Sequence, residues 1–276
     1  PVGESKSDFE IFSEIASKLN FKDKFTEGKD EDKWLRHIWN EARSKAKDEG
    51  FTLPEFDKFW KNGFKEVLSP KKQTILLEDF RKDPQKNPIS TPSGKIEIFS
   101  ETVDSFNYQD CPGHPTWLEQ KEWLGSNLTN QYPLQLISGQ PHNRLHSQLD
   151  NGSESQNYKI LGREPIKIHP KDAQSRGLIN GDIVEVFNKR GKCLAGVIIS
   201  NEVMKGVVFL AVGAWYDPIN DGDFCIHGNP NVLTEDIGTS SLAQGPSAHS
   251  TLVEIKKYTK ELPEISIFNK PNIVNK

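Results

Sequence analysis

Short β-type runs crowd the second half of the chain, and this crowding restricts the possible folds more than any other feature. Each run is bounded by Gly, Asn, Asp or Pro, and neighbouring runs lie close together in the sequence. Such spacing favours a barrel or a sandwich over alternating strand–helix units. We therefore predict that this half is mainly β. The runs are YPLQLIS, PIKIHP, GDIVEVFN, KCLAGVIIS and KGVVFLAVG, and the strand TLVEI follows near the end.

Two local patterns refine this β half. The stretch NKRGKC joins two of the runs as a hairpin turn, and Gly191 is the residue expected at a positive φ. Upstream of it, Pro170 suits the first position of a helix, Asp172 falls in the first turn, and Gly177 lies just past the end. One short helix is therefore expected to lead into the hairpin.

The first half of the chain is charged, rich in lysine and helical in pattern. Apolar residues recur at helical spacing in FEIFSEIASKL, where Ser7 and Asp8 are candidate N-caps, and in EDKWLRHIWNEARSKAKDEG, which stops at Gly50. TLPEFDKFWKNG predicts a third, shorter helix. In NPISTPSGKIEIFS, Pro and Gly precede the alternating Ile96 and Ile98, which predicts a turn that feeds a strand.

These patterns predict an α+β chain, in which a mostly helical segment precedes a barrel-like, mainly β domain. We expect the helical segment over residues 1–125 and six or seven strands with short helices over residues 126–258. Residues 259–276 contain two prolines and little periodicity, so they are expected to form an extended strap or tail on the surface.

Charge and cysteine content argue against several classes of partner and site. The 35 basic and 39 acidic residues are interspersed and give a net charge of −4, so no basic stripe faces nucleic-acid phosphates. No apolar run reaches the roughly 18 residues that a membrane span needs. Cys111, Cys193 and Cys225 are widely separated, which favours core or surface thiols over a disulfide framework or a zinc site. We therefore expect neither a nucleic-acid partner nor membrane insertion.

The loop LISGQPHNRLHSQLDNGS, residues 136–153, is rich in hydrogen-bonding groups. His142 and His146 are four residues apart, but the glutamate of a zinc protease motif is missing between them. Arg144 offers a rigid fork of donors, so the loop could bind a phosphate or a purine edge. A solvent-exposed polar loop without a ligand is the alternative. Further candidate donors are Ser138, Ser147 and Gln148.

A second polar loop, GNPNVLTEDIGTSSLAQGPSAHS, covers residues 228–250. Its glycines would let the backbone approach a ligand closely, and its amides and hydroxyls could read the edges of a heterocycle. Ser240 and Ser241 lack the GxSxG frame of a nucleophile elbow, and the chain contains no GxGxxG or Walker glycine loop. The loop is a candidate ligand contact, and a purely structural loop is the alternative. Its candidate residues are Asn231, Asp236, Thr239, Ser240 and Gln244.

Four single residues also permit two interpretations. His114 in CPGHPTW and His227 in CIHGNP could donate a proton, but hydrogen-bonded packing is the favoured role for each. Trp215 and Tyr216 in GAWYDP could line a substrate funnel, although packing against the barrel is the favoured role for this aromatic pair.

Taken together, five stretches resemble the C-terminal part of the bacterial molybdenum enzymes that reduce trimethylamine N-oxide, dimethyl sulfoxide, and biotin or methionine sulfoxide. The resemblance implies a fragment of an enzyme that holds molybdenum on two molybdopterin guanine dinucleotides and transfers an oxygen atom at the metal. It also implies that residues 1–125 belong to neighbouring α/β domains. The matching stretches are TPSGKIEIFSETVDSF, CPGHPTW, LISGQPHNRLHSQLD, GAWYDP and GNPNVLTEDIGTSSLAQGPSAH.

The same resemblance implies specific roles for the two polar loops. The β domain would close over the cofactor, with the first loop on pterin and pyrophosphate groups and the second loop on the other side. The serine that ligates molybdenum would lie outside this chain, so no catalytic or metal-ligating residue is expected here and the fragment alone would be inactive. The cofactor-binding residues carried over are Ser138, Gln140, His142, Arg144, His146, Ser147, Gln148, Asn231, Asp236, Thr239, Ser240 and Gln244.

The remaining implications concern substrate, partner and compartment. The substrate would be a small S- or N-oxide, with trimethylamine N-oxide favoured, and the electron donor a cytochrome c-type protein. A periplasmic location is favoured over a cytoplasmic one. A free-standing, noncatalytic module that binds a nucleotide or a protein through the same loops is the alternative function.

Overall fold

We describe a computed structural model that covers residues 3–67, 75–219, 222 and 224–270. The chain forms two compact units, Pro1–Ile89 and Ser90–Lys276. The boundary between them lies upstream of residue 125, where the domain boundary is expected from the sequence. That expected boundary concerns the division of a larger enzyme and stays a prediction.

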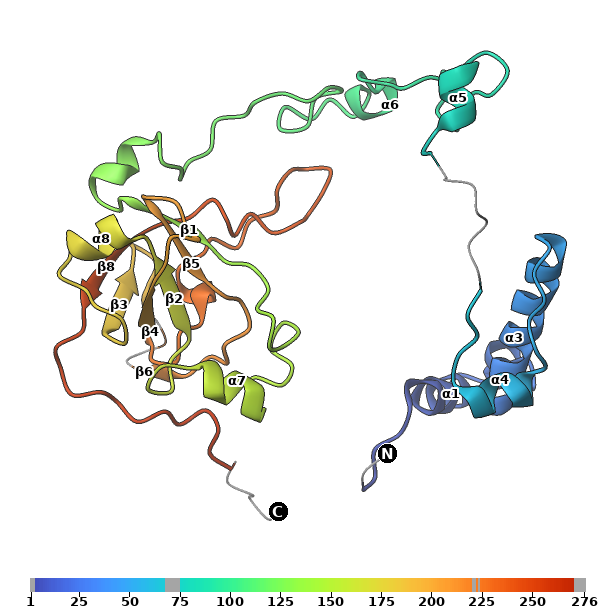
Figure 1. Ribbon diagram of the computed structural model, residues 1–276, viewed down its shortest axis with the longest axis horizontal. Helices are drawn as coiled ribbons and strands as arrows, with labels where there is room; N and C mark the ends of the chain where they lie inside the picture. The colour runs from blue at the N-terminus through green and yellow to red at the C-terminus, as the bar shows by residue number, and fades with distance from the viewer. Residues whose placement is uncertain (1–2, 68–74, 220–221, 223, 271–276) are drawn as a thin grey trace. The chain divides into compact units, whose positions relative to one another are not determined.

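The first unit is helical, and its first helix begins after Ser7, one of the two N-cap candidates in the sequence (Figure 1). Ser7 accepts a hydrogen bond from the Glu10 amide while the Glu10 carboxylate accepts one from the Ser7 amide, which forms a capping box. The longest helix ends just before Gly50, whose φ is +83°. Trp39 stacks on Phe59 with 3.7 Å between ring centroids, which packs the third helix against the fourth. The helices are α1 (Asp8–Lys18), α2 (Lys22–Thr26), α3 (Glu31–Asp48), α4 (Phe56–Asn62) and α5 (Glu78–Lys82).

The prediction of a strand around Ile96 and Ile98 is wrong. The preceding turn forms, since the Gly94 amide donates to the Thr91 carbonyl at 2.9 Å, but no β-pairing includes residues 95–99, all of which are described. Ile96 and Ile98 are 66% and 79% exposed. Alternation alone does not make a strand, because a strand also needs a partner for its backbone groups. The regular elements of this region are α6 (Glu101–Asp104) and the 3-10 turn η1 (Asn127–Asn130).

Six strands of the second unit close into a mixed barrel, as predicted (Figure 1). Their order is β2-β5-β1-β8-β3-β4, and a pairing of β4 with β2 closes the ring. β4 pairs with β3 over its first half, where β7 lies on its other side, and with β2 over its second half. The strands are β1 (Leu134–Ile137), β2 (Pro165–Ile168), β3 (Ile183–Phe187), β4 (Lys192–Ile199), β5 (Val207–Leu210) and β8 (Leu252–Lys257), with the outer pair β6 (Pro218–Ile219) and β7 (Phe224–Cys225).

The barrel has a packed apolar core. Successive side chains of a strand point to opposite faces, so Leu134 and Leu136 of β1 both face inward and are buried. Ile166 and Ile168 of β2 meet them in the same cluster. Cys193 is buried in this core as well, as expected for a structural thiol. The interior is therefore filled by side chains, and ligands can bind only at the ends or on the outside of the barrel.

The local predictions for the β half are mostly confirmed. The helix α8 (Pro170–Gln174) has its proline in the first turn, and Gly177 follows with a φ of +62°. The hairpin between β3 and β4 also forms, but Gly191 is not among the glycines with positive φ, contrary to prediction. The Asn188 side chain instead accepts a hydrogen bond from the Arg190 amide at 3.0 Å, so an Asn-based turn reverses the chain.

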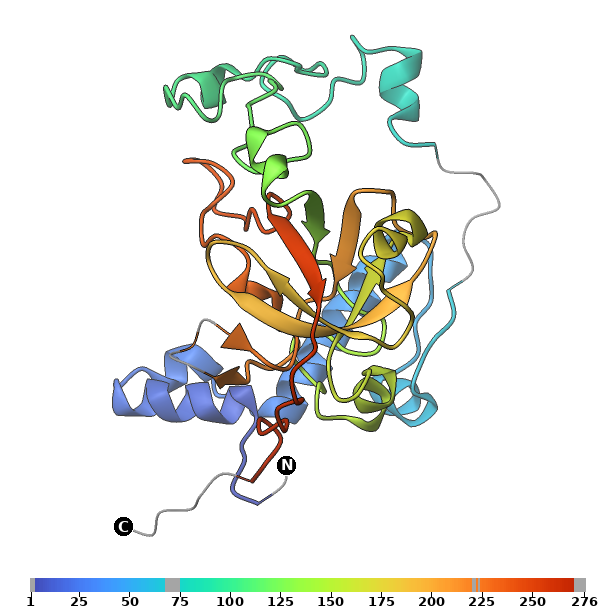
Figure 2. The same cartoon turned by 90° about the vertical axis from the view of Figure 1, so that its left-hand side faces the viewer.

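After β8 the chain continues as an extended strap, residues 258–270, which Figure 2 shows in dark red. The buried Asp217 carboxylate accepts hydrogen bonds from the amide and hydroxyl of Ser266, both at 2.7 Å, and from the Ile267 amide at 3.1 Å. Phe268 packs edge-on against the His227 ring. The strap is therefore attached to the barrel by both polar and aromatic contacts. Residues 271–276 of the expected tail lie outside the described residues.

Candidate functional site

A groove of about 880 Å³ lies at one end of the barrel. β1 and β5 are parallel neighbours, so their carboxyl ends reach this end together, and β8, antiparallel to β1, begins there. Segments that are distant in the sequence therefore converge on the groove. Its described lining contains hydroxyls, amides, imidazoles and aromatic rings, but no Lys, Arg, Asp or Glu. It comes from residues 138–140, 146–147, 212–216, 229, 231, 246, 248–249 and 267.

The loop at residues 138–148 is held in shape by its own side chains. Oε1 of the Gln140 side chain accepts a hydrogen bond from the backbone amide of His146 at 3.1 Å. Nε2 of the same side chain lies 2.8 Å from Nδ1 of the His146 ring. The Ser138 amide donates to Nδ1 of His249 at 3.2 Å, which leaves the proton of a neutral His249 on Nε2. The loop thus presents a preformed wall of hydrogen-bonding groups.

A close backbone contact joins this loop to the segment after β5. Gly213 has a φ of +92°, and a Cβ atom at this position would lie 1.7 Å from the His146 carbonyl oxygen. The Trp215 indole donates to the Ser147 carbonyl at 2.7 Å. Only glycine fits at position 213, so residues 212–216 and the loop form one continuous side of the groove.

Arg144 does not face the groove, because its guanidinium is turned into the protein and is fully buried. Nη2 lies 3.0 Å from Glu164 and donates to the Val212 carbonyl at 2.7 Å, while Nη1 lies 3.6 Å from Asp150. The sequence-based picture of Arg144 as an open donor for a phosphate therefore lacks the necessary exposure. A guanidinium paired with two carboxylates is already neutralised.

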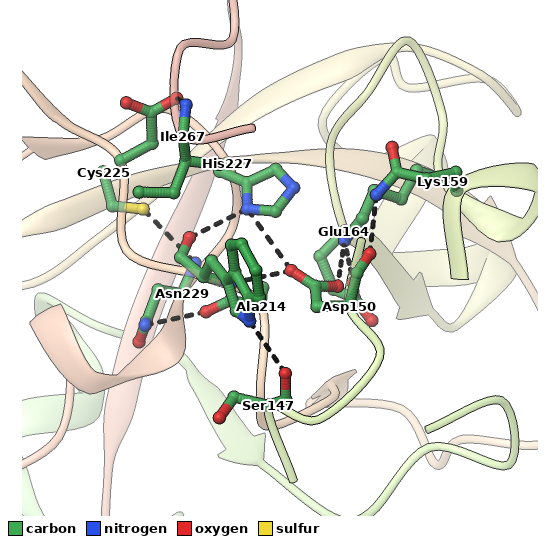
Figure 3. Close-up of polar contacts among 12 residues, drawn as sticks. Ser147, Asp150, Lys159, Glu164, Ala214, Cys225, His227, Asn229 and Ile267 are labelled. Carbon is green, nitrogen blue, oxygen red and sulfur yellow. Dashed lines mark hydrogen bonds and ion pairs between the residues drawn. The ribbon is translucent and has the colours of Figure 1, made fainter. Parts of the chain in front are cut away.

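Arg144 belongs to a buried charged cluster, defined here as Arg144, Asp150, Lys159, Glu164 and His227. Figure 3 labels the last four of these residues. The Lys159 ammonium lies 2.8 Å from Asp150 and 2.9 Å from Glu164. Asp150 also accepts a hydrogen bond from the Trp215 amide at 2.8 Å. Two cations face two carboxylates, and this balance makes their burial tolerable.

His227 is the uncharged member of this cluster. Burial lowers the pKa of His227, and the nearby Lys159 ammonium lowers it further. Nδ1 lies 2.8 Å from the Trp215 carbonyl and therefore carries the proton of the neutral ring. Nε2 is buried and has no hydrogen-bond partner in the part of the chain that the structure describes. His227 thus acts as a hydrogen-bonded packing residue, which was the favoured interpretation of its sequence setting.

The residues predicted in the first loop fall into four groups. Four of them line the groove, His142 lines a separate pocket of about 190 Å³, and Arg144 is inside the protein. The Gln148 residue is exposed, and its backbone amide donates a hydrogen bond to the Leu145 carbonyl at 2.9 Å. The four that line the groove are Ser138, Gln140, His146 and Ser147.

Of the residues predicted in the second loop, the structure brings only Asn231 to the groove. Thr239, Ser240 and Gln244 form hydrogen bonds within their own loop, for example from the Thr239 hydroxyl to the Ala243 carbonyl at 2.8 Å. Asp236 is exposed. Their roles toward a ligand stay predictions.

Sequence reasoning missed several residues that build the site. Asn229 and His249 line the groove, and Trp215 and Tyr216 line it too, although packing is the role favoured for them from sequence. Asp150 had a visible signal, since it is the first carboxylate after a long acid-free loop. Lys159 and Glu164 were also missed; the local turn between Ile160 and Arg163 brings them together, and Asp150 and Arg144 join them from the preceding loop.

The described residues contain neither a metal-binding cluster nor a membrane-spanning helix. No group of three or more His, Cys, Asp or Glu residues there could hold a metal ion. No helix within residues 3–67, 75–219, 222 and 224–270 has the length and apolar character needed to cross a bilayer.

Comparisons with known proteins agree with this architecture. Residues 134–252 match the model of the molydopterin dinucleotide binding domain. This range begins at the first residue of β1 and ends at the first residue of β8. Acetylene hydratase from Pelobacter acetylenicus has a similar fold, with a TM-score of 0.68 and 19% identity over 94% of this chain and 34% of its own. The barrel fold predicted from the sequence is thereby confirmed.

Sequence relatives cover nearly the whole chain. Trimethylamine-N-oxide reductase of Haemophilus influenzae is 44% identical over 99% of this chain, and trimethylamine-N-oxide reductase 1 of Escherichia coli K12 is 46% identical over 96%. Dimethyl sulfoxide/trimethylamine N-oxide reductase of Rhodobacter capsulatus is 42% identical over 94%. The chain spans 34%, 32% and 32% of these relatives, about a third of their length.

Proposed function

Because this chain is homologous to about a third of the trimethylamine-N-oxide reductases and contains a molydopterin dinucleotide binding domain, we propose that it is the C-terminal, cofactor-capping part of a molybdenum reductase. The complete enzyme would reduce an S- or N-oxide, with trimethylamine N-oxide favoured by the names of the relatives. The cofactor would be the bis(molybdopterin guanine dinucleotide) form of molybdenum. A periplasmic location and a cytochrome c-type electron donor belong to the same proposal.

The groove carries this proposal because its size and chemistry suit part of a dinucleotide. Its volume falls within the roughly 300–1,000 Å³ of ordinary small-molecule sites. Pterin and guanine are flat heterocycles with several donors and acceptors on their edges, and amide, hydroxyl and imidazole groups line the groove.

The chain's own residues would bind, orient and shield the cofactor. When bound, the molybdenum centre supplies two-electron oxygen-atom transfer. Gln140, His146 and His249 would hydrogen-bond the heterocycle, and Trp215 would cover one side of it. Trp215 itself packs against Phe268 of the strap, with 5.3 Å between the ring centroids.

Metal and nucleotide analysis of the full-length protein tests the proposal. The protein would be expressed with any coding sequence upstream of residue 1, in a host that makes the cofactor. Elemental analysis should find about one molybdenum per chain, and acid release should give about two guanine nucleotides. A well-folded protein with neither would refute the reductase function and favour a noncatalytic binding module.

A further inference from the structure

The buried charged cluster lies directly behind the wall of the groove. Three of its members contact the backbone of residues 212–215, which line the groove on their other side. Arg144 donates to the Val212 carbonyl at 2.7 Å, Asp150 accepts from the Trp215 amide at 2.8 Å, and His227 bonds the Trp215 carbonyl at 2.8 Å. Figure 3 shows Asp150, Glu164 and Lys159 gathered on this side. Both ends of the segment are therefore held from within.

The cluster also ties the groove to distant parts of the chain. Asp150 ends the first polar loop, Lys159 follows the helix α7 (Ser153–Tyr158), and Glu164 precedes β2. The Gln156 side chain donates to the Asp150 carbonyl at 2.6 Å, which anchors the loop end to α7. The loop at 138–148 and the segment 212–216 are thus fixed to one rigid block.

Stability alone is a weak reason for such a cluster. Removing charges from water is costly, and buried ion pairs often add no more stability than apolar side chains of the same size. Their directional contacts, however, can select one arrangement of the backbone. Here the contacts end on the carbonyl and amide groups of the groove wall.

We propose that Asp150 is a positioning residue for the groove: held in place by Lys159, it fixes the Trp215 backbone so that the groove is preformed for its ligand. Asp150 does not line the groove, so it acts through Trp215 and not by contact with the ligand. Lys159 and Arg144 balance its charge from the side of Oδ1, which leaves Oδ2 to accept the hydrogen bond from the Trp215 amide. The identity of the ligand rests on the proposed function, whereas the rigidity of the segment does not.

Two variants separate positioning from stability. Lys159→Met breaks the ion pairs but leaves the Asp150 contact to the Trp215 amide in place, so an unbalanced negative charge should lower stability. Asp150→Leu combined with Lys159→Met restores the charge balance between Arg144 and Glu164 but removes the acceptor of the Trp215 amide. The double variant should therefore be the more stable of the two and have the looser groove.

The matched control is Glu254→Gln, which removes one charge from the pair between Arg176 and Glu254 at 2.7 Å. That pair joins the segment after α8 to β8, and neither residue lines the groove. The three variants and the wild type would be compared as full-length protein by thermal unfolding, by released guanine nucleotide after gel filtration, and by hydrogen exchange of the Trp215 amide.

The expected results run in opposite directions. The double variant should exchange the Trp215 amide at least about tenfold faster than Lys159→Met. It should also retain the nucleotide about 10- to 100-fold less well, despite its higher unfolding midpoint. Retention that follows the unfolding midpoint would overturn the proposal and leave the cluster a purely structural feature. If the wild type holds no nucleotide, the proposed function fails, yet equal exchange rates in the two variants would still refute positioning.

Discussion

Alanine at position 213 should damage the groove more than any comparable change elsewhere on the barrel. Gly213 has a φ of +92°, a conformation that costs an alanine about 1–2 kcal/mol. Its new methyl group would also lie 1.7 Å from the His146 carbonyl oxygen, so this contact would have to open by about 1.6 Å to reach an ordinary carbon–oxygen distance.

This movement would break hydrogen bonds that join the two sides of the contact. One runs from the Trp215 indole to the Ser147 carbonyl, and the other runs from the Arg144 guanidinium to the Val212 carbonyl; each is 2.7 Å long. Their loss adds about 2 kcal/mol, so the total destabilisation should be about 3–4 kcal/mol. The cofactor proposed for the groove should be lost at the same time.

Urea unfolding and nucleotide release measure these two effects, and Gly181→Ala is the matched control. Gly181 has a φ of +85°, but nothing lies within 4 Å of the place where its methyl group would be. It should therefore cost only the backbone strain of about 1–2 kcal/mol and leave nucleotide content unchanged. If the two variants are equally stable and retain equal nucleotide, the close contact between Gly213 and the loop does not exist in solution.

Three further predictions follow from the site and the strap. His146→Ala should lower nucleotide retention with little change in unfolding midpoint. Arg144→Ala should cost about 3–5 kcal/mol of stability, because it leaves Lys159 as the one cation facing two buried carboxylates; similar effects of both variants on urea unfolding would contradict this difference. Burial and Lys159 hold the pKa of His227 below its usual value. As the pH is lowered below about 6.5, the unfolded chain therefore protonates this imidazole before the folded chain does, and the stability of the fold decreases. Urea midpoints of His227→Gln should change less between about pH 7.5 and 5.5 than those of the wild type, and equal slopes would show that His227 is not the group responsible. Asp217→Ala removes the acceptor of three hydrogen bonds from Ser266 and Ile267, so limited trypsin digestion should cut at Lys260 faster than in the wild type; unchanged digestion would mean that other contacts hold the strap.

The fold could be predicted because its signals are local. The runs that became β1 to β5 and β8 are apolar and bounded by turn residues, so each could be recognised without knowing its partner. Pro170 and Gly177 marked α8 in the same way. The prediction of a strand at Ile96 and Ile98 failed because alternation is only one requirement of a strand. The other is a neighbouring strand, which the segment's own sequence does not reveal.

The site was harder to predict because its members meet only in three dimensions. Residue types suggested the first loop as a candidate ligand wall. Ser138, Gln140, His146 and Ser147 line the groove, and their contact with a ligand stays a prediction. The direction of Arg144 could not be foreseen, since it depends on a carboxylate twenty residues away, Glu164, and on a carbonyl on another strand's loop. His249 was overlooked because its contact with Ser138 depends on the pairing of β1 with β8.

The place of β8 in the ring has a consequence for biosynthesis. β8 lies between β1 and β3 and is the last of the six strands to be made. Nearly 120 residues separate Leu134 from its partner Val253, so the barrel depends on very long-range pairing and should close slowly. Until β8 leaves the ribosome, β1 and β3 have an open gap between them and His249 has no fixed position. The groove therefore cannot be assembled during most of translation, and a ligand that needs it must be inserted after synthesis of the barrel is complete.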